Sequence, residues 1–228
     1  MKELKSLKLV ALDIDGPCVM DTFSPVIRLV VHKLGGEYTA EIERNVFSQN
    51  RLKAAQFLIA KLNLNIGAEE LIGMYFKERA AYEESVEHGI NVGLGEFIGL
   101  LENLGLRLIC YGGLDKNYFE EQLGDLSGRF EDYICTNDFR PGLKEIVQMY
   151  APLPKSAFLF IDDVARVAET ARQLKLPFVG IPASFDWSFQ RSEMERLGAP
   201  YIFDSVRDLS ESTIREIDEK AANGFWPT

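Results

Sequence analysis

The sequence predicts an α/β protein whose core is a Rossmann-like parallel sheet, with an inserted all-helical cap domain. Two observations lead to this prediction. Short apolar runs alternate with segments of helical periodicity along most of the chain, which is the pattern of a parallel sheet covered by helices on both faces. Residues 14–105, between the first and second apolar runs, read as almost wholly helical. Because that interval is far longer than one crossover helix needs, we expect an insertion there.

The expected strands are nearly continuously apolar, which indicates burial on both faces. In chain order they are Leu7–Asp13, Leu106–Tyr111, Tyr133–Thr136, Ala157–Asp162, Phe178–Ile181 and Tyr201–Phe203. In sheets of this kind, ligands bind beyond the carboxyl ends of the strands, where the winding direction reverses. Asp13 and Asp162 both stand at such ends, so we expect the functional site there.

The domain boundaries follow from the position of the helical interval. With 228 residues, 46% of them apolar, the chain is long enough for one large core or for a core with a smaller inserted domain. We place the cap domain at residues 22–87 and the Rossmann-like core at residues 1–21 and 88–228.

Helix signals within the cap are local. A Ser-Pro pair at residues 24–25 predicts the start of the first helix, with serine as the N-cap, and a Gly-Gly pair at residues 35–36 predicts its end. Two further helices are expected over residues 50–64 and 68–85, where apolar residues recur at helical spacing. We expect these apolar residues to form the cap's own core.

Charge and hydropathy exclude several classes of protein. Lysine and arginine number 25 against 35 aspartate and glutamate residues, for a net charge of −10, so nucleic-acid binding is not expected. No stretch approaches the ~20 apolar residues that span a membrane, and the first residues run into a strand without a signal-peptide pattern. We therefore expect a soluble, cytoplasmic protein without a membrane partner.

Cysteine and histidine residues give no sign of a metal or disulfide framework. Cys18, Cys110 and Cys135 are odd in number and lack C-x-x-C spacing, so we expect reduced thiols in or near strands. His32 and His88 show no metal-ligand spacing and enter no predicted mechanism.

Two predicted strands end in paired acids. Asp13 and Asp15 are two residues apart, so their side chains leave the same face of a continuing strand, and Asp162 and Asp163 end another strand. Like charges raise each other's pKa, and a fold tolerates them best when a cation or a proton-using reaction balances them. Each acid alone could instead cap a helix or lie in a solvated turn. Together they would form an oxygen-rich site suited to Mg²⁺.

These features resemble the haloacid dehalogenase superfamily, in its phosphatase and phosphomutase branch with an α-helical cap. The resemblance covers the whole chain. It rests on DIDG at residues 13–16, Asp21 at the opening of the cap, RLICYGG at residues 107–113, RPG at residues 140–142 and IDD at residues 161–163.

The resemblance implies a role for each acid. Asp13 would attack phosphorus and form an aspartyl-phosphate, and Asp15 would be the general acid and base. Mg²⁺ would be held by Asp13, the Asp15 backbone carbonyl and Asp162, with Asp163 as a further candidate. Backbone amides after Asp13 would bind the transferred oxygens. An acid at residue 15 favours phosphoester chemistry, since dehalogenases of the family typically carry tyrosine there and ion-pumping ATPases carry threonine.

The chain departs from the family pattern at its phosphate-binding positions. Tyr111 stands where serine or threonine is expected, and the Gly112 amide is an alternative phosphate donor. The phenol of Tyr111 would either point away from the pocket or narrow it. Arg140 stands where a lysine is usual; it keeps the positive charge with a planar, bidentate geometry. Lys144, one helical turn later, is the alternative cation.

Another departure lies between the acids and the cap, where the family has Thr-Leu after the glycine and this chain has Pro17 and Cys18. This changes the turn but removes no catalytic side chain. Within the cap, Arg51 and Lys53 are candidates for binding a second anionic group, or are ordinary solvated helix charges.

The sequence therefore predicts a Mg²⁺-dependent hydrolase that acts on a small phosphorylated metabolite, with a mobile cap that excludes water. The alternatives are a catalytically weakened binding or regulatory protein that keeps the acidic site, or a phosphomutase or other hydrolase of the same superfamily. The sequence names neither the substrate nor the oligomeric state.

Overall fold

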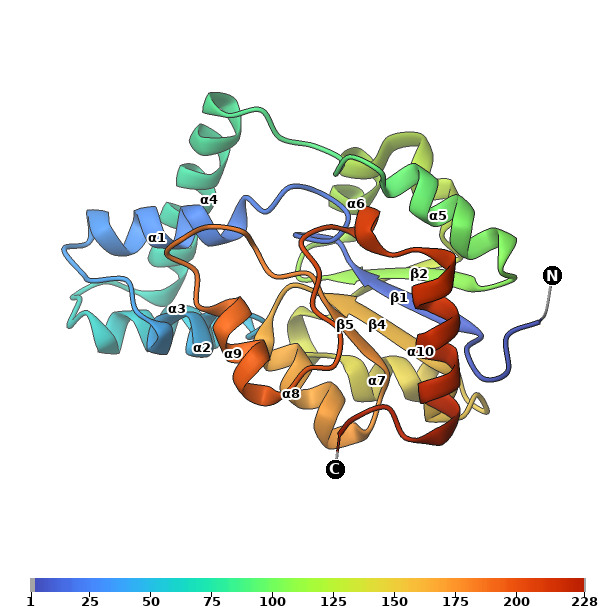
Figure 1. Ribbon diagram of the computed structural model, residues 1–228. Helices are drawn as coiled ribbons and strands as arrows, with labels where there is room; N and C mark the ends of the chain where they lie inside the picture. Colours follow the sequence, from blue (N-terminus) through green and yellow to red (C-terminus); the bar gives the residue numbers. More distant parts are fainter. Residues whose placement is uncertain (1–2, 228) are drawn as a thin grey trace.

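The computed structural model describes residues 3–227, and a parallel five-stranded sheet lies at the centre of these residues (Figure 1). Met1, Lys2 and Thr228, which the predicted core also includes, lie outside the described residues. The strands are β1 (Leu9–Asp13), β2 (Arg107–Gly112), β3 (Asp132–Cys135), β4 (Phe158–Asp162) and β5 (Phe178–Gly180). Their order across the sheet is β3-β2-β1-β4-β5, and every pairing is parallel. The predicted α/β class is therefore confirmed.

The winding direction reverses at β1. The chain runs from β1 outward through β2 to β3, returns across the sheet to β4, and continues outward to β5. The carboxyl ends of β1 and β4 are neighbours, because Leu9–Leu12 of β1 pair in register with Phe158–Ile161 of β4. This places Asp13 and Asp162 at the switch point, where ligands bind in sheets of this type.

The predicted strand at residues 201–203 is not a strand in the structure. Ile202 forms an isolated parallel bridge with Gly180, supported by backbone hydrogen bonds on either side of it. The neighbouring β5 is itself only three residues long, so it offers this segment too few backbone groups for a ladder.

Helices flank the sheet and connect the strands. They are α1 (Phe23–Lys33), α2 (Ala40–Val46), α3 (Arg51–Lys61), α4 (Ala68–Ser85), α5 (Leu94–Asn103), α6 (Lys116–Leu123), α7 (Leu143–Met149), α8 (Ala165–Leu174), α9 (Gln190–Leu197) and α10 (Glu211–Asn223). Short 3-10 helices cover Gly124–Arg129, Asn137–Phe139, Lys155–Ala157 and Val206–Asp208. In Figure 1, α5 and α10 cover one face of the sheet, and α7 and α8 cover the other. Within residues 3–227, no helix combines the length and apolar composition needed to cross a membrane.

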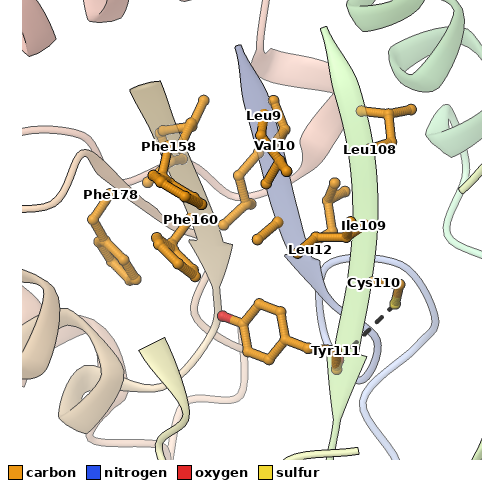
Figure 2. Close-up of a cluster of buried hydrophobic side chains, with 14 of the residues drawn as sticks. Leu9, Val10, Leu12, Leu108, Ile109, Cys110, Tyr111, Phe158, Phe160 and Phe178 are labelled. Atoms are coloured by element: carbon orange, nitrogen blue, oxygen red, sulfur yellow. Dashed lines mark hydrogen bonds between the residues drawn. The ribbon is translucent and has the colours of Figure 1, made fainter. Parts of the chain in front are cut away.

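The main core lies on both faces of the sheet, as the continuous apolar strands predict. Every residue of β1 and of β4 is buried. Figure 2 shows aromatic side chains from β4 and β5 beside aliphatic side chains of β1 and β2; the rings of Phe158 and Phe160 stack with centroids 6.1 Å apart. Each fully buried Leu, Ile or Phe side chain contributes about 1.5–3 kcal/mol relative to exposure.

A second, separate apolar cluster holds α1–α4 together. Its buried residues are Val26, Ile27, Val30, Val31, Tyr38, Ile42, Val46, Phe47, Ala54, Ala55, Leu58 and Leu71. These helices lie beside the sheet at the left of Figure 1. The buried side chains of α5, by contrast, belong to the main core. This division of the packing supports the predicted boundary, and we propose residues 22–87 as the cap domain.

The cap helices match the sequence prediction with two differences. α4 covers residues 68–85 as predicted, and α1 ends before Gly35, whose φ of 77° is readily adopted only by glycine. However, α1 begins at Phe23, and Ser24 is not its N-cap. The Asp21 carboxylate accepts the hydrogen bond from the Ser24 amide instead. The short helix α2, which is capped by the Thr39 side chain, was not predicted from the sequence.

The segment before β1 is held by one buried carboxylate. Asp218 of α10 accepts hydrogen bonds from the backbone N–H groups of Lys5, Ser6 and Leu7 at 2.7–2.8 Å. The side chains of the neighbouring Lys5–Glu219 ion pair are 52% and 63% exposed. The two acids therefore differ in burial although they are adjacent in sequence.

Asp218→Ala is expected to lower the free energy of unfolding by about 3 kcal/mol, because three N–H groups lose a charged acceptor. Glu219→Ala is the control and should cost less than about 1 kcal/mol, as an exposed ion pair. Urea unfolding of the three proteins measures both values. Equal losses in the two variants would contradict this account.

Candidate active site

Four carboxylates meet at the carboxyl ends of β1 and β4. Asp13 is the last residue of β1, Asp162 is the last residue of β4, and Asp15 and Asp163 follow them. All four line one cavity of about 140 Å³ between the core and the cap. The structure thus brings together the four acids that were predicted from the sequence.

Burial raises the pKa of Asp13, Asp162 and Asp163, which makes these three carboxylates hard to ionise. It raises the pKa of Asp13 well above its usual range, and the charge of Asp162 raises it further. Burial raises the pKa of Asp162 to about 6, although hydrogen bonds from Tyr111 and the Val164 amide lower it. Burial and then the charge of Asp162 raise the pKa of Asp163. Positive charge beside these carboxylates would lower their pKa values and favour their ionised forms.

Gly16 permits the close approach of the two acidic segments. Its φ is 92°, and a Cβ added there would lie 2.7 Å from the Asp163 carboxylate. Only glycine fits this turn, which accounts for the glycine of the DIDG motif. Two amides after Asp13 are engaged within the protein: the Ile14 N–H donates to the Tyr111 carbonyl, and the Gly16 N–H donates to the Val19 carbonyl.

Arg140 provides a cation at the acidic end of the cavity. It lines the cavity, and its charge lowers the pKa of both Asp13 and Asp162. Its Nε atom is buried without a hydrogen-bond partner among the described residues, and so is Oδ1 of Asp13. Lys144, the alternative cation, is exposed and is not among the residues that line the cavity.

Tyr111 does not line the cavity. Its side chain is fully buried, and its phenol donates a 2.6 Å hydrogen bond to Oδ2 of Asp162. Figure 2 shows the Tyr111 ring extending from β2 toward β4; its centroid lies 6.1 Å from that of Phe160. Of the two possibilities for the phenol, the structure does not support a narrowed pocket, because the ring lies outside the lining and its hydroxyl is directed at the Asp162 carboxylate.

Gly112 is also set back from the cavity, and the next residue, Gly113, lines it instead. The Gly112 carbonyl accepts hydrogen bonds from the amide and hydroxyl of Thr136. A Cβ at residue 112 would lie 2.6 Å from the Ile14 side chain, and one at residue 113 would collide with the Arg140 guanidinium. Gly112 therefore packs closely against Ile14, and Gly113 packs closely against the Arg140 guanidinium.

Asp15 is held by two residues that were not predicted from the sequence. The Tyr118 hydroxyl donates a 2.6 Å hydrogen bond to Oδ1 of Asp15, and Arg79 Nη2 lies 3.2 Å from the same oxygen. Arg79 is only 5% exposed, and its Nε donates to Glu83 at 2.8 Å. Because Arg79 belongs to α4, the cap directly contacts an acid of the core.

One signal in the sequence could have indicated Arg79. It lies four residues after Tyr75 and eight after Leu71, so it continues the apolar stripe of α4. A charge on an apolar helix stripe usually has a buried partner. No comparable local signal marks Tyr118, whose contact with Asp15 depends on the tertiary fold.

The remaining predicted residues are divided between the cavity and the surface. Arg51 lines the cavity, and its guanidinium donates to the Gly113 carbonyl at 2.9 Å and to Asn137 Oδ1 at 3.3 Å. Lys53 is exposed and does not line the cavity. The cysteines are free thiols, as predicted; Cys135 is exposed and the other two are buried.

The acidic end of the cavity is suited to a Mg²⁺ ion whose coordination shell includes waters and substrate oxygens. It is less suited to an ion coordinated by protein side chains alone. Among residues 3–227, no group of three or more His, Cys, Asp or Glu side chains is arranged to hold a metal. Mg²⁺, however, usually takes one or two carboxylates and completes its shell with waters and substrate oxygens. The unpartnered Oδ1 of Asp13 and the raised pKa of its neighbours are consistent with that kind of site.

The fold matches solved structures over the whole chain. A phosphonoacetaldehyde hydrolase-like protein from Oleispira antarctica is 15% identical, with a TM-score of 0.71 over 100% of this chain and 98% of that one. The β-phosphoglucomutase of Clostridium difficile is 14% identical, with a TM-score of 0.70 over 95% and 99% of the two chains. This chain has the haloacid dehalogenase fold with a helical cap. The resemblance predicted from the sequence is thereby confirmed for the fold.

A third match is a mutant of CbbY from Rhodobacter sphaeroides, crystallised in complex with xylulose-(1,5)-bisphosphate. It is 13% identical, with a TM-score of 0.64 over 90% of this chain and 96% of that one. No protein-family model and no curated protein matches the sequence. At these identities, the likeness to haloacid dehalogenase-fold structures establishes the architecture alone.

The raised carboxylate pKa values predict how stability of the metal-free protein depends on pH. The folded state binds protons more tightly than the unfolded state, whose Asp pKa is 3.8, so stability falls as pH rises through about 6, the folded value for Asp162. Asp163→Asn should therefore raise the melting temperature at pH 8 in EDTA and flatten its decline from pH 5 to 8.

Asp125→Asn, at an exposed position, is the control for this experiment and should leave the profile unchanged. Thermal unfolding followed by circular dichroism gives the required values. A wild-type protein that becomes more stable between pH 5 and 8 in EDTA would contradict the assigned direction.

Proposed function

We propose that this protein is a Mg²⁺-dependent hydrolase of small phosphorylated metabolites that works through an aspartyl-phosphate on Asp13. One observation carries the proposal: Oδ1 of Asp13 and Nε of Arg140 are both buried, both lack a partner among the described residues, and belong to side chains that line one cavity. A nucleophilic oxygen and a cationic donor left free in one enclosed space suit a phosphoryl group between them.

Asp13 must be ionised to attack phosphorus. Its burial and the charge of Asp162 both oppose ionisation by raising its pKa. Arg140 offsets part of the cost. Asp13, Asp162 and the Asp15 backbone carbonyl would hold Mg²⁺, with Asp163 as a further candidate. When bound, Mg²⁺ would supply the charge that keeps the carboxylates ionised and lowers their repulsion toward phosphate.

Asp15 is the proposed general acid and base, and the network around it supports that role. Tyr118 and Arg79 both reach its Oδ1, which fixes the orientation of the carboxylate. We assign proton transfer to Oδ2: protonation of the leaving oxygen first, then removal of a proton from the attacking water. Arg79 is a positioning residue supplied by the cap, so opening of the cap would release Asp15 and closure would restore it.

Tyr111 is proposed to position Asp162 and not to bind phosphate. Its phenol donates to Asp162 and lies outside the cavity. A tyrosine at this position therefore leaves the phosphate space open, and this favours the hydrolase over the weakened binding protein. The phosphorylated sugar bound to CbbY is a ligand of that protein; for this chain it supports only the broad class of substrate.

Asp13→Asn is expected to lower Mg²⁺-dependent turnover of p-nitrophenyl phosphate by about a thousandfold or more, because an amide is a poor nucleophile. Thermal unfolding should show that the variant is folded. Exposed Asp125→Asn is the matched control and should keep wild-type activity. Turnover by Asp13→Asn within tenfold of wild type, or none by the wild type, would contradict the proposal.

Tyr111→Phe keeps the buried ring and removes the hydrogen bond to Asp162. That hydrogen bond lowers the pKa of Asp162, so the variant should need a higher pH or more Mg²⁺ for half-maximal activity. The loss at saturating Mg²⁺ should stay below about 2 kcal/mol in transition-state energy. A large gain in turnover would show instead that the phenol obstructs the site, and an unchanged Mg²⁺ titration would show that it does not act on Asp162.

A further inference from the structure

The part of the cavity within the cap is lined by apolar side chains that have no role in the proposed chemistry. From the carboxylates, the cavity extends between three cap helices. Its apolar lining includes Ile27 and Val30 of α1, Ala55 and Leu58 of α3, and Leu71 and Ile72 of α4. The cavity is thus charged at the core end and mainly apolar between the cap helices, where Ser48, Gln49 and Tyr75 are the uncharged polar residues of the lining.

Positive charge is available only at the core end of this cavity. Three arginines are among its lining residues. Arg79 is paired with Asp15 and Glu83, and Arg51 donates to the Gly113 carbonyl and to Asn137. Of these three arginines, only Arg140 has a buried nitrogen without a hydrogen-bond partner among the described residues. A second phosphate or carboxylate on the substrate would therefore lie in apolar surroundings without a free cation.

The lining also includes a buried hydroxyl without a partner in the described part of the chain, in a loop whose next residues contact the core. Ser48 lies in the loop between α2 and α3, is 8% exposed, and lines the cavity. Its hydroxyl has no hydrogen-bond partner among the described residues, and its φ of 49° is unusual for a residue other than glycine. Buried hydroxyls are normally satisfied, so this one points to a ligand in the space.

We propose that the substrate is a phosphate monoester with one phosphate and an apolar leaving group, which enters the cap between α1, α3 and α4. This rests on the proposed function and adds the chemical class of the leaving group. The cavity, at about 140 Å³, is similar in size to an apolar cavity of roughly 150 Å³ that binds benzene. Because the phosphoryl group would take part of this volume, the space left between the cap helices suits a short alkyl chain or at most a single ring. A sugar would bury several hydroxyls against the mainly apolar lining.

The first test measures binding without turnover. Phosphonates cannot be hydrolysed at the C–P bond by this chemistry, so their affinities for the wild-type protein with Mg²⁺ report the site alone. Calorimetry with methyl-, propyl-, pentyl- and phenylphosphonate should show affinity increasing by up to about fourfold per methylene. 2,3-Dihydroxypropylphosphonate should bind no better than methylphosphonate. A flat series, or tightest binding by the dihydroxy compound, overturns the inference.

A matched pair of variants locates the effect. Ala55→Leu would fill the cavity, and should lower affinity for pentylphosphonate at least tenfold while changing that for methylphosphonate less than twofold. Ala60→Leu makes the same change on the exposed side of α3 and should alter neither. If Ala55→Leu does not fold, Leu58→Ala enlarges the same space and should move the optimum to longer chains. An unchanged chain-length series in a folded Ala55 or Leu58 variant overturns the assignment.

The second test separates this inference from the proposed function. With Mg²⁺, kcat/KM should be higher for phenyl and pentyl phosphate than for glucose 6-phosphate, phosphoglycolate or a sugar bisphosphate. A higher value for any of the polar esters overturns the inference and leaves the hydrolase intact. If the phosphonates bind as expected but no ester is hydrolysed, the result contradicts the proposed hydrolase. It would support instead a site that binds an anion carrying an apolar group.

Discussion

The crowding of buried carboxylates at the end of β1 and β4 is the constraint on which the rest of the site depends. Asp13, Asp162 and Asp163 are taken out of water by the same packing that makes the sheet stable. Burial and mutual repulsion raise the pKa of all three. Such a cluster destabilises the folded state at neutral pH unless positive charge is supplied. The cluster is therefore suited to binding a cation, and a bound cation would in turn favour an anionic substrate.

Side chains from both the core and the cap contact the carboxylates of the site or lie beside them. Tyr111 supports Asp162 from behind the site, and Arg140 faces the cavity from the core. Arg79 reaches Asp15 from the cap, so the position of one acid depends on the position of another domain. Arg79 joins α4 to Asp15, and α4 also lines the apolar space between α1, α3 and α4. Substrate selection in the cap and proton transfer in the core would thus be coupled through α4.

Much of the fold could be predicted because its signals are local. Nearly continuous apolar runs indicate strands buried on both faces. Because ligands bind beyond the carboxyl ends of the strands in such sheets, Asp13 and Asp162 could be expected to meet there. The segment at residues 201–203 looked like a strand by composition, but it pairs with the three-residue strand β5 through a single bridge between Ile202 and Gly180. The helix α2 was missed because it is short and carries few apolar residues.

The contacts within the site were harder to predict because they join distant parts of the chain. Asp15 and Arg79 are brought together by the way α4 lies against the core, and Tyr118 reaches them from α6. The direction of the Tyr111 ring depends on the register of β2 beside β1 and on the space next to Phe160. Sequence spacing alone shows neither, and it also does not show that the cap cavity is apolar.

The central claim is that Asp13 is a nucleophile beside a cation site and Arg140. A crystal structure with Mg²⁺ and beryllofluoride, which mimics a phosphoryl group on a carboxylate, tests it most directly. We expect beryllium bonded to an oxygen of Asp13, a fluorine within hydrogen-bond distance of the Arg140 guanidinium, and Mg²⁺ contacting Asp13 and Asp162. A structure with Mg²⁺ bound and no adduct on Asp13, or with the adduct on another carboxylate, would contradict the claim.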